Sequence, residues 1–268
     1  MVTEFTELQG EMGKEYALLD GEKPEVAQAI FEQYMPRFAG DILPKESIGR
    51  ALSLADKLDN LAATFLRGLL PTGSQDPFAL RRQTIGAVNI LTDGKIHWDI
   101  RRGIAGALDL LPGEENAKKT ALSQVEDFFR QRIRAILLDR GIAYDIIDAV
   151  LEGPVDDVYA LFLKAESMTA AHVKEELDMR QAVTRLANIT KGRTAGEVKP
   201  ELLQEEAEKA LYQALEEAMK IIAPACREYR YEEALPAMKA LAAPINACLD
   251  EVMIMVDDEA VRNNRISL

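Results

Sequence analysis

Residues 47–66 read SIGRALSLADKLDNLAATFL, and this stretch decides the class of fold. Apolar side chains recur in it at intervals of three and four, which is the period of a helix and not of a strand. The predicted apolar stripe is formed by Ile48, Ala51, Leu52, Ala55, Leu58 and Ala62. Gly68 and Pro71 follow and stop the run. We therefore expect one long amphipathic helix that ends near Leu66.

The same period continues on both sides of this stretch, so we expect an all-α fold. The other predicted helices cover residues 24–35, 77–91, 103–111, 119–140, 144–151, 155–165, 169–190, 200–223, 231–239 and 244–256. Asp76 is the expected N-cap and Pro77 the expected first residue of the helix over 77–91. Residues 95–100 alternate only weakly and have no partner run nearby, which favours a connector over a strand.

The composition is that of a folded chain with room for more than one domain. It has 268 residues, of which 48% are hydrophobic and 29% are charged, and these values exclude wholesale disorder. No run approaches the roughly 20 apolar residues of a membrane helix, and the acidic start lacks the basic flank of a signal peptide. The two cysteines, Cys226 and Cys248, are expected in the core of a cytoplasmic protein.

No catalytic or metal-binding motif is visible. The chain has only two histidines and no Cys-x-x-Cys pair, so we expect no metal site, and it carries neither a Gly-x-Ser-x-Gly elbow nor a phosphate-binding Gly-x-x-x-x-Gly-Lys loop. Asp56 and Asp59 lie three residues apart on one predicted helix face. A carboxylate pair of this kind can serve acid–base chemistry, but it is more often a solvated acidic face.

Basic residues are more informative, because a net charge of −13 means that any nucleic-acid binding must come from a local basic face. Arginine forks bind phosphate oxygens in pairs, and Arg and Asn read base edges. The candidates are Arg81, Arg82, Arg130, Arg134, Arg185, Asn188, Lys191, Arg193, Arg262, Asn263 and Arg265. Arg132 lies between two of them, whose spacing puts them on one face. The alternative is that these cations pair with the abundant Asp and Glu.

Several segments resemble one family, the β subunit of bacterial glycyl-tRNA synthetase of the tetrameric type. The most distinctive is PTGSQDPFALRR at residues 71–82, and the stretches at 4–17, 32–44 and 55–61 are similar to the same family. The segments RLANI at 185–189 and VMIMVDDEAVRNNR at 252–265 resemble the anticodon-binding domain that this family shares with arginyl-tRNA synthetases.

The resemblance implies a domain order. Residues 1–113 would be the C-terminal part of a degenerate HD-like domain with connector helices. Residues 114–268 would be a helical tRNA-binding region with a DALR-type core at about 155–268. Asp56 stands where HD hydrolases place a metal-binding Asp, but the histidines that complete such a site have no counterpart. The chain would then be a fragment of a longer subunit.

The resemblance also implies a function. The family ligates glycine to its tRNA, with ATP-dependent activation on the α subunit and tRNA held by β. This chain would therefore bind glycine tRNA and the α subunit, but neither DNA nor membrane, and would have no catalytic residue or cofactor of its own. If it reads an anticodon, Arg185, Asn188, Arg262 and Arg265 should share one face. The alternatives are an HD-type phosphohydrolase remnant and a helical protein–protein adaptor.

Overall fold

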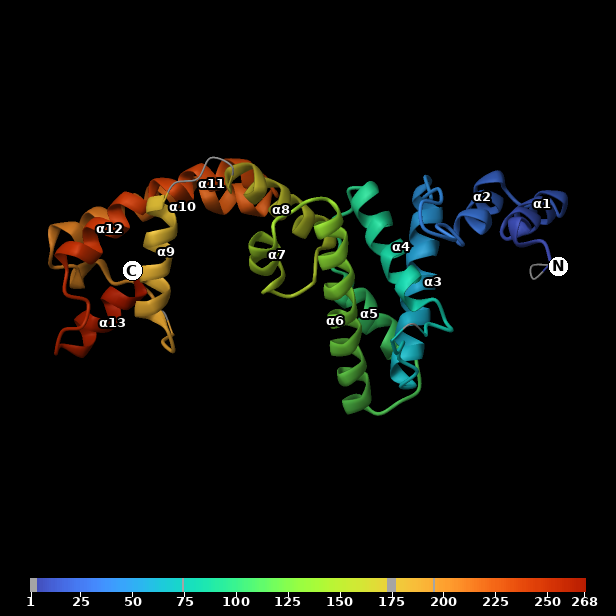
Figure 1. Ribbon diagram of the computed structural model, residues 1–268, viewed down its shortest axis with the longest axis horizontal. Coiled ribbons are helices and arrows are strands. Elements are labelled where there is room, and N and C mark those ends of the chain that lie inside the picture. The colour runs from blue at the N-terminus through green and yellow to red at the C-terminus, as the bar shows by residue number, and fades with distance from the viewer. Residues whose placement is uncertain (1–3, 74, 173–176, 195) are drawn as a thin grey trace. The chain divides into compact units, whose positions relative to one another are not determined.

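The computed structural model describes residues 4–73, 75–172, 177–194 and 196–268, and in these ranges the chain is all-α (Figure 1). The extended pairings within these ranges are two isolated bridges, Thr72 with Gln75 and Asp99 with Asp157, and no strand is formed. The predicted fold class is confirmed. Residues 95–99 form a connector, as expected, and Ile100 begins the next helix.

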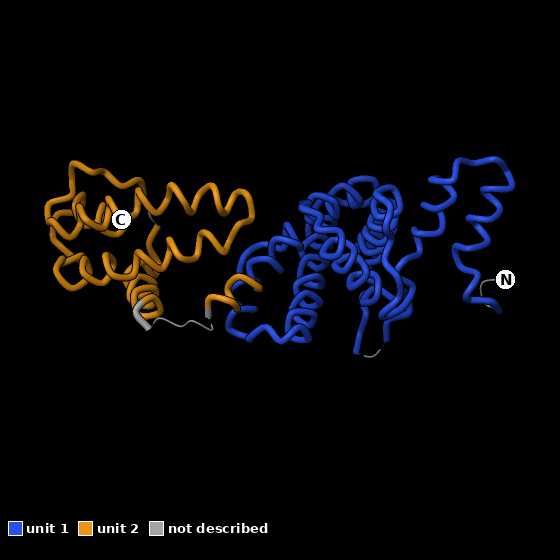
Figure 2. Tube along the Cα trace, turned by 90° about the horizontal axis from the view of Figure 1, so that it is seen from above, with its two compact units in different colours: residues 1–165 blue, residues 166–268 orange. Residues whose placement is uncertain are grey.

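Contacts divide the chain into two compact units, residues 1–165 (unit 1) and 166–268 (unit 2) (Figure 2). Unit 1 contains η1 (Thr6–Leu8), α1 (Glu11–Leu19), α2 (Pro24–Glu32), α3 (Ser47–Leu66), α4 (Leu80–Asp93), α5 (Ile100–Asp109), α6 (Glu115–Asp139) and α7 (Tyr144–Leu151). The division falls inside α8 (Val158–His172). Unit 2 continues with α9 (Leu177–Thr190), η2 (Pro200–Leu202), α10 (Glu206–Arg227), α11 (Tyr231–Ala240), α12 (Ala242–Glu251) and α13 (Glu259–Ser267).

The core of unit 1 is built around α3, which packs against α4, α5 and α6 (Figure 1). Phe65 of α3 meets Phe128 of α6 edge to face, with ring centroids 5.3 Å apart. Because α6 belongs to this packing, the boundary expected after residue 113 does not coincide with the division by contacts.

The helix over 47–66 has its predicted bounds, but of the predicted stripe only Leu58 and Ala62 are buried. Leu54, Leu58, Leu61 and Phe65 are buried, whereas Ile48 is 52% exposed and Leu52 is 37% exposed. The stretch carries two apolar stripes at helical spacing, and the periodicity alone does not say which one meets the neighbouring helices.

Several helix boundaries differ from the prediction by a few residues. Helix α4 begins at Leu80 rather than Pro77, because Ala79 adopts a left-handed conformation with φ 54° and separates Pro77 from the helix. Asp76 still satisfies the helix start, since its carboxylate accepts the Leu80 and Arg81 N–H groups at 2.8 and 2.9 Å. The break expected at 166–168 lies inside α8, and Pro224 lies inside α10 instead of ending it. Helices α1 and α13 were not predicted.

Unit 2 has a smaller core between α9, α10 and α12. It is formed by Ala182, Leu211, Ala242, Ile245, Cys248 and Val252. Cys248 is buried as predicted, but Cys226 is exposed, so the expectation that both thiols lie in the core was wrong for Cys226. Among the described helices, none is long and apolar enough to cross a membrane.

Candidate nucleic-acid interface

Two of the predicted cations of unit 2 are anchored at the segment between α12 and α13. Arg193, from the loop after α9, contacts the Met255 sulfur at 3.1 Å through Nη1, and Arg262 of α13 donates from Nη1 to the Val256 carbonyl at 2.9 Å. Two arginines that are distant in sequence are thus anchored on consecutive residues. Each guanidinium has further N–H groups in addition to the anchored one.

The loop that carries Arg193 is fastened to α13 through main-chain hydrogen bonds. The buried Asn264 side chain accepts the Lys199 N–H at 2.6 Å and donates to the Lys199 carbonyl at 3.0 Å. The Gly196 N–H donates to Ser267 Oγ at 2.8 Å. These bonds place Lys199 beside the exposed Asn263, and both line a hollow of about 480 Å³.

Arg193 and Arg262 are anchored before α13, and Lys199 and Asn263 line the hollow beside it; we call these four residues the α13 patch. Lys199 was not among the predicted residues, because nothing in the sequence around it signals that it reaches α13. The patch combines cations with an amide, which is the chemistry that contacts phosphates and base edges. Glu197 lines the same hollow, so the patch is locally mixed in charge rather than uniformly basic.

The structure does not assemble the face expected from Arg185, Asn188, Arg262 and Arg265. Arg265 is buried, and its Nε and Nη2 donate to the two oxygens of Glu208 at 2.6 and 3.3 Å, so it is a residue of the interior. Arg185 is held by Asn246 and Asp250 of α12, at 3.1 and 2.6 Å. Asn188 and Lys191 are exposed at the end of α9 and beyond it.

In unit 1, Arg130 and Arg134 have internal partners. Arg130 donates to the carbonyls of Leu151 and Gly153, at 3.2 and 3.1 Å, and pairs with Asp127. Arg134 pairs with Asp148 at 2.6 Å. Both side chains therefore contact α7 or the turn after it, which was the alternative weighed for the basic residues. Between them, Arg132 has no partner for its Nε among the described residues.

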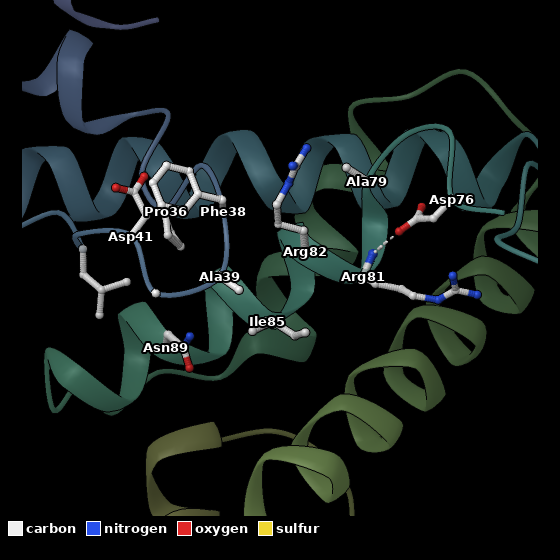
Figure 3. Close-up of a pocket in the computed structure, with 13 residues that line it drawn as sticks. Pro36, Phe38, Ala39, Asp41, Asp76, Ala79, Arg81, Arg82, Ile85 and Asn89 are labelled. Carbon is white, nitrogen blue, oxygen red and sulfur yellow. Dashed lines mark hydrogen bonds between the residues drawn. The ribbon is translucent and has the colours of Figure 1, made fainter. Parts of the chain in front are cut away.

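Arg81 and Arg82 line a hollow of about 480 Å³ between α4 and the loop that contains Phe38 and Asp41 (Figure 3). Arg81 donates to the Gly73 carbonyl at 2.6 Å. Arg82 is exposed, and no hydrogen bond or ion pair involves its side chain within the described ranges. The hollow thus has one anchored and one free arginine on its α4 side.

The region around Asp56 resembles a hydrolase centre only in part. Asp56 accepts a long hydrogen bond of 3.4 Å from the Gln33 side chain, and Asp59 is exposed. Within the described residues, no group of three or more His, Cys, Asp or Glu side chains is placed to hold a metal ion. The neighbouring Lys57 is buried, and its ammonium donates to the Met35 carbonyl at 2.9 Å and to Ser53 Oγ at 2.7 Å.

Lys57 gives unit 1 a testable pH dependence. Burial lowers the pKa of its ammonium from 10.5 to about 8, although Asp56 opposes the shift. Between these two pH values the unfolded chain binds more protons than the folded chain, so folding stability rises with pH. Relative to Lys57→Met, the wild type should therefore gain roughly 2–3 kcal/mol from pH 8 to pH 10.5. Urea unfolding across this pH range measures the free energies of unfolding, and Lys119→Met, at an exposed lysine, is the reference variant. A difference in free energy between the wild type and Lys57→Met that does not change with pH would contradict the prediction.

Comparison with known proteins gives two family matches. Residues 1–152 match the family described as glycyl-tRNA synthetase beta subunit, and residues 179–268 match the DALR anticodon binding domain. The α13 patch lies within the second match. Among curated relatives, the chain is 42% identical to the glycine–tRNA ligase beta subunit of Clostridioides difficile and 40% identical to that of Desulforamulus reducens. Both alignments cover 100% of this chain but 39% of the relative, so the chain spans about two fifths of the proteins it matches.

Proposed function

The chain belongs to the glycyl-tRNA synthetase β-subunit family, and from that premise we propose that it is a tRNA-holding part of a glycine–tRNA ligase. In this proposal the α13 patch contacts the anticodon region of glycine tRNA. The chain itself has no catalytic residue and no cofactor. Glycine activation with ATP takes place on a partner α subunit, in the cytoplasm, where translation occurs.

The observation that carries the proposal is the α13 patch within the DALR match. Single-stranded anticodon bases are unstacked, so their edges and faces are open to Arg and Asn side chains. Arg193 and Arg262 are anchored through single Nη1 atoms, which leaves guanidinium edges for a base or a phosphate. Because Asn264 and Ser267 hold the loop by its backbone, the patch is largely formed before RNA arrives, and little ordering entropy opposes binding.

Arg262→Ala is the variant that tests this assignment. If Arg262 reads a base, discrimination between glycine tRNA and an anticodon-swapped tRNA should fall by about 1–3 kcal/mol. If it contacts a phosphate instead, both RNAs should bind more weakly and the salt slope should fall by about one. Fluorescence anisotropy or native gel shift with the two tRNAs at several salt concentrations distinguishes these results.

The matched control is Arg227→Ala, which removes an exposed arginine at the end of α10 in the same unit. It should leave affinity and discrimination unchanged. Tight wild-type binding that neither tRNA identity nor Arg262 affects would refute the anticodon role. A chain that binds neither RNA, but binds the α subunit independently of salt, would be a helical adaptor.

A further inference from the structure

A second group of arginines lies in unit 1, between the start of α4 and the middle of α6. Arg132 of α6 stacks on Phe128, with its guanidinium carbon 4.6 Å from the ring centroid. Its Nε is buried and has no hydrogen-bond partner among the described residues. Across from it, Arg81 extends from α4 towards α6 and is anchored on the Gly73 carbonyl (Figure 3).

The two guanidinium groups lie close enough to influence each other. Burial lowers the pKa of Arg132, the positive charge of Arg81 lowers it further, and Asp76 opposes the shift. Proteins rarely keep a partly buried cation beside a second cation without an anion, since the like-charge contact costs free energy. Asp76 offsets only part of this positive charge, because its carboxylate already accepts the backbone N–H groups of Leu80 and Arg81.

We propose that Arg81 and Arg132 together bind one phosphate group of an RNA backbone. Two neighbouring guanidinium groups can together provide N–H donors for the oxygens of one phosphate, and the charge of Arg132 has no anionic hydrogen-bond partner at its Nε among the described residues. The inference deepens the proposed function, on which it rests, by adding a backbone contact in unit 1 to the patch in unit 2.

Charge balance favours a phosphodiester over a free nucleotide. Arg81, Arg132 and Asp76 together carry one net positive charge, which matches the single negative charge of a backbone phosphate. A triphosphate would bring several negative charges close to the Asp76 carboxylate. A contact of this kind positions RNA without reading its sequence.

The test uses the 268-residue chain and two RNAs, glycine tRNA and the anticodon-swapped tRNA. Arg132→Gln and Arg81→Gln should each weaken binding of both RNAs about tenfold near 0.1 M salt. Each should reduce the slope of log K against log salt by about one. The slope reports how many phosphates the protein neutralises. Because both arginines would contact the same phosphate, the double variant should reduce the slope by about one and not by two.

Arg101→Gln is the matched control. It removes the same charge from an exposed arginine of unit 1 that pairs with Glu126 at 3.3 Å, and it should leave the slope unchanged. Arg132→Lys keeps the charge without the fork, so it should retain the slope with weaker binding. Circular dichroism verifies that each variant is folded. If Arg132→Gln is not folded, the binding data for Arg81→Gln and Arg132→Lys decide whether the phosphate site exists.

The outcomes separate this inference from the proposed function. Wild-type binding that is unaffected by Arg132→Gln and Arg81→Gln overturns the phosphate site and leaves the anticodon proposal intact. A wild-type chain that binds neither tRNA overturns both. Arg132-dependent binding of pyrophosphate or ATP, with unchanged tRNA affinity, overturns the RNA backbone as the source of the phosphate.

Discussion

Replacing Arg265 with Leu should lower the free energy of unfolding of unit 2 by about 3–5 kcal/mol. The reason is that Glu208 has no exposed surface and would lose both guanidinium hydrogen bonds, which leaves a buried carboxylate with only backbone donors. The Met253 carbonyl would also lose the hydrogen bond from Arg265 Nη1. Urea unfolding followed by amide hydrogen exchange in α10 and α13 measures the loss where it occurs.

The double variant Glu208→Leu/Arg265→Leu provides the internal control, because it removes both charges and should recover much of the loss. Lys209→Leu, next to Glu208, removes only a surface ion pair with Glu206 from a half-exposed side chain and should leave unit 2 nearly unchanged. Equal instability of Arg265→Leu and the double variant would show that packing, and not the unpaired carboxylate, is responsible.

The same pair makes unit 2 sensitive to acid. Burial alone would raise the pKa of Glu208. Hydrogen bonds from Arg265 and from the backbone N–H groups of Glu205 and Gln204 outweigh burial, so the pKa of Glu208 in the folded chain lies below its ordinary value of 4.5. A carboxylate with a lowered folded pKa stabilises the fold above its unfolded pKa, and that stabilisation is lost as the pH falls through the folded value. Unit 2 of the wild type should therefore lose stability below pH 4.5, and the double variant should lose less.

Glu32→Ala should lower the free energy of unfolding of unit 1 by about 2–4 kcal/mol. The buried Glu32 carboxylate accepts the Lys45 and Glu46 N–H groups, both at 3.2 Å, and the Gln28 side chain at 3.0 Å. It thereby joins α2 to the start of α3, where backbone N–H groups have no partner within the helix. Thermal unfolding followed by circular dichroism measures the effect.

Glu25→Ala is the control on the same helix, since Glu25 is exposed and lies 4.0 Å from Lys23. It should change the midpoint little. If Glu32→Ala has the same melting temperature as the wild type, water replaces the carboxylate at the start of α3 and the prediction is wrong.

Local signals predicted the helices better than they predicted the surfaces. The period of three and four gave α3 its bounds, but Leu54 and Ile48 are both apolar at helical spacing, and only tertiary packing distinguishes the buried one from the exposed one. The start of α4 was misplaced because the left-handed conformation of Ala79 has no signature in its residue type. Sequence reports what a helix can bury, whereas the neighbouring helices decide what it does bury.

The candidate site shows the same limit. Arg262 and Arg265 lie three residues apart in one motif, yet Arg265 meets Glu208, which is 57 residues away, and only Arg262 remains near the surface. Likewise Arg130 and Arg134 have partners beside α7, whereas the Nε of Arg132 between them has no hydrogen-bond partner in the described part of the chain. Which cation is free depends on long-range contacts that spacing does not encode.

The hold of Asn264 on Lys199 has a consequence for protein engineering. Asn264 bonds to main-chain groups of Lys199, and Ser267 Oγ accepts the Gly196 main-chain N–H while donating to the Asn263 carbonyl of its own helix. The path of this loop is thus independent of the side chains at Glu197 and Lys199. At those two positions the charge and size of the side chain can therefore be changed without moving the backbone. Asn264 has no substitute among the other residue types that both donates and accepts in the same geometry.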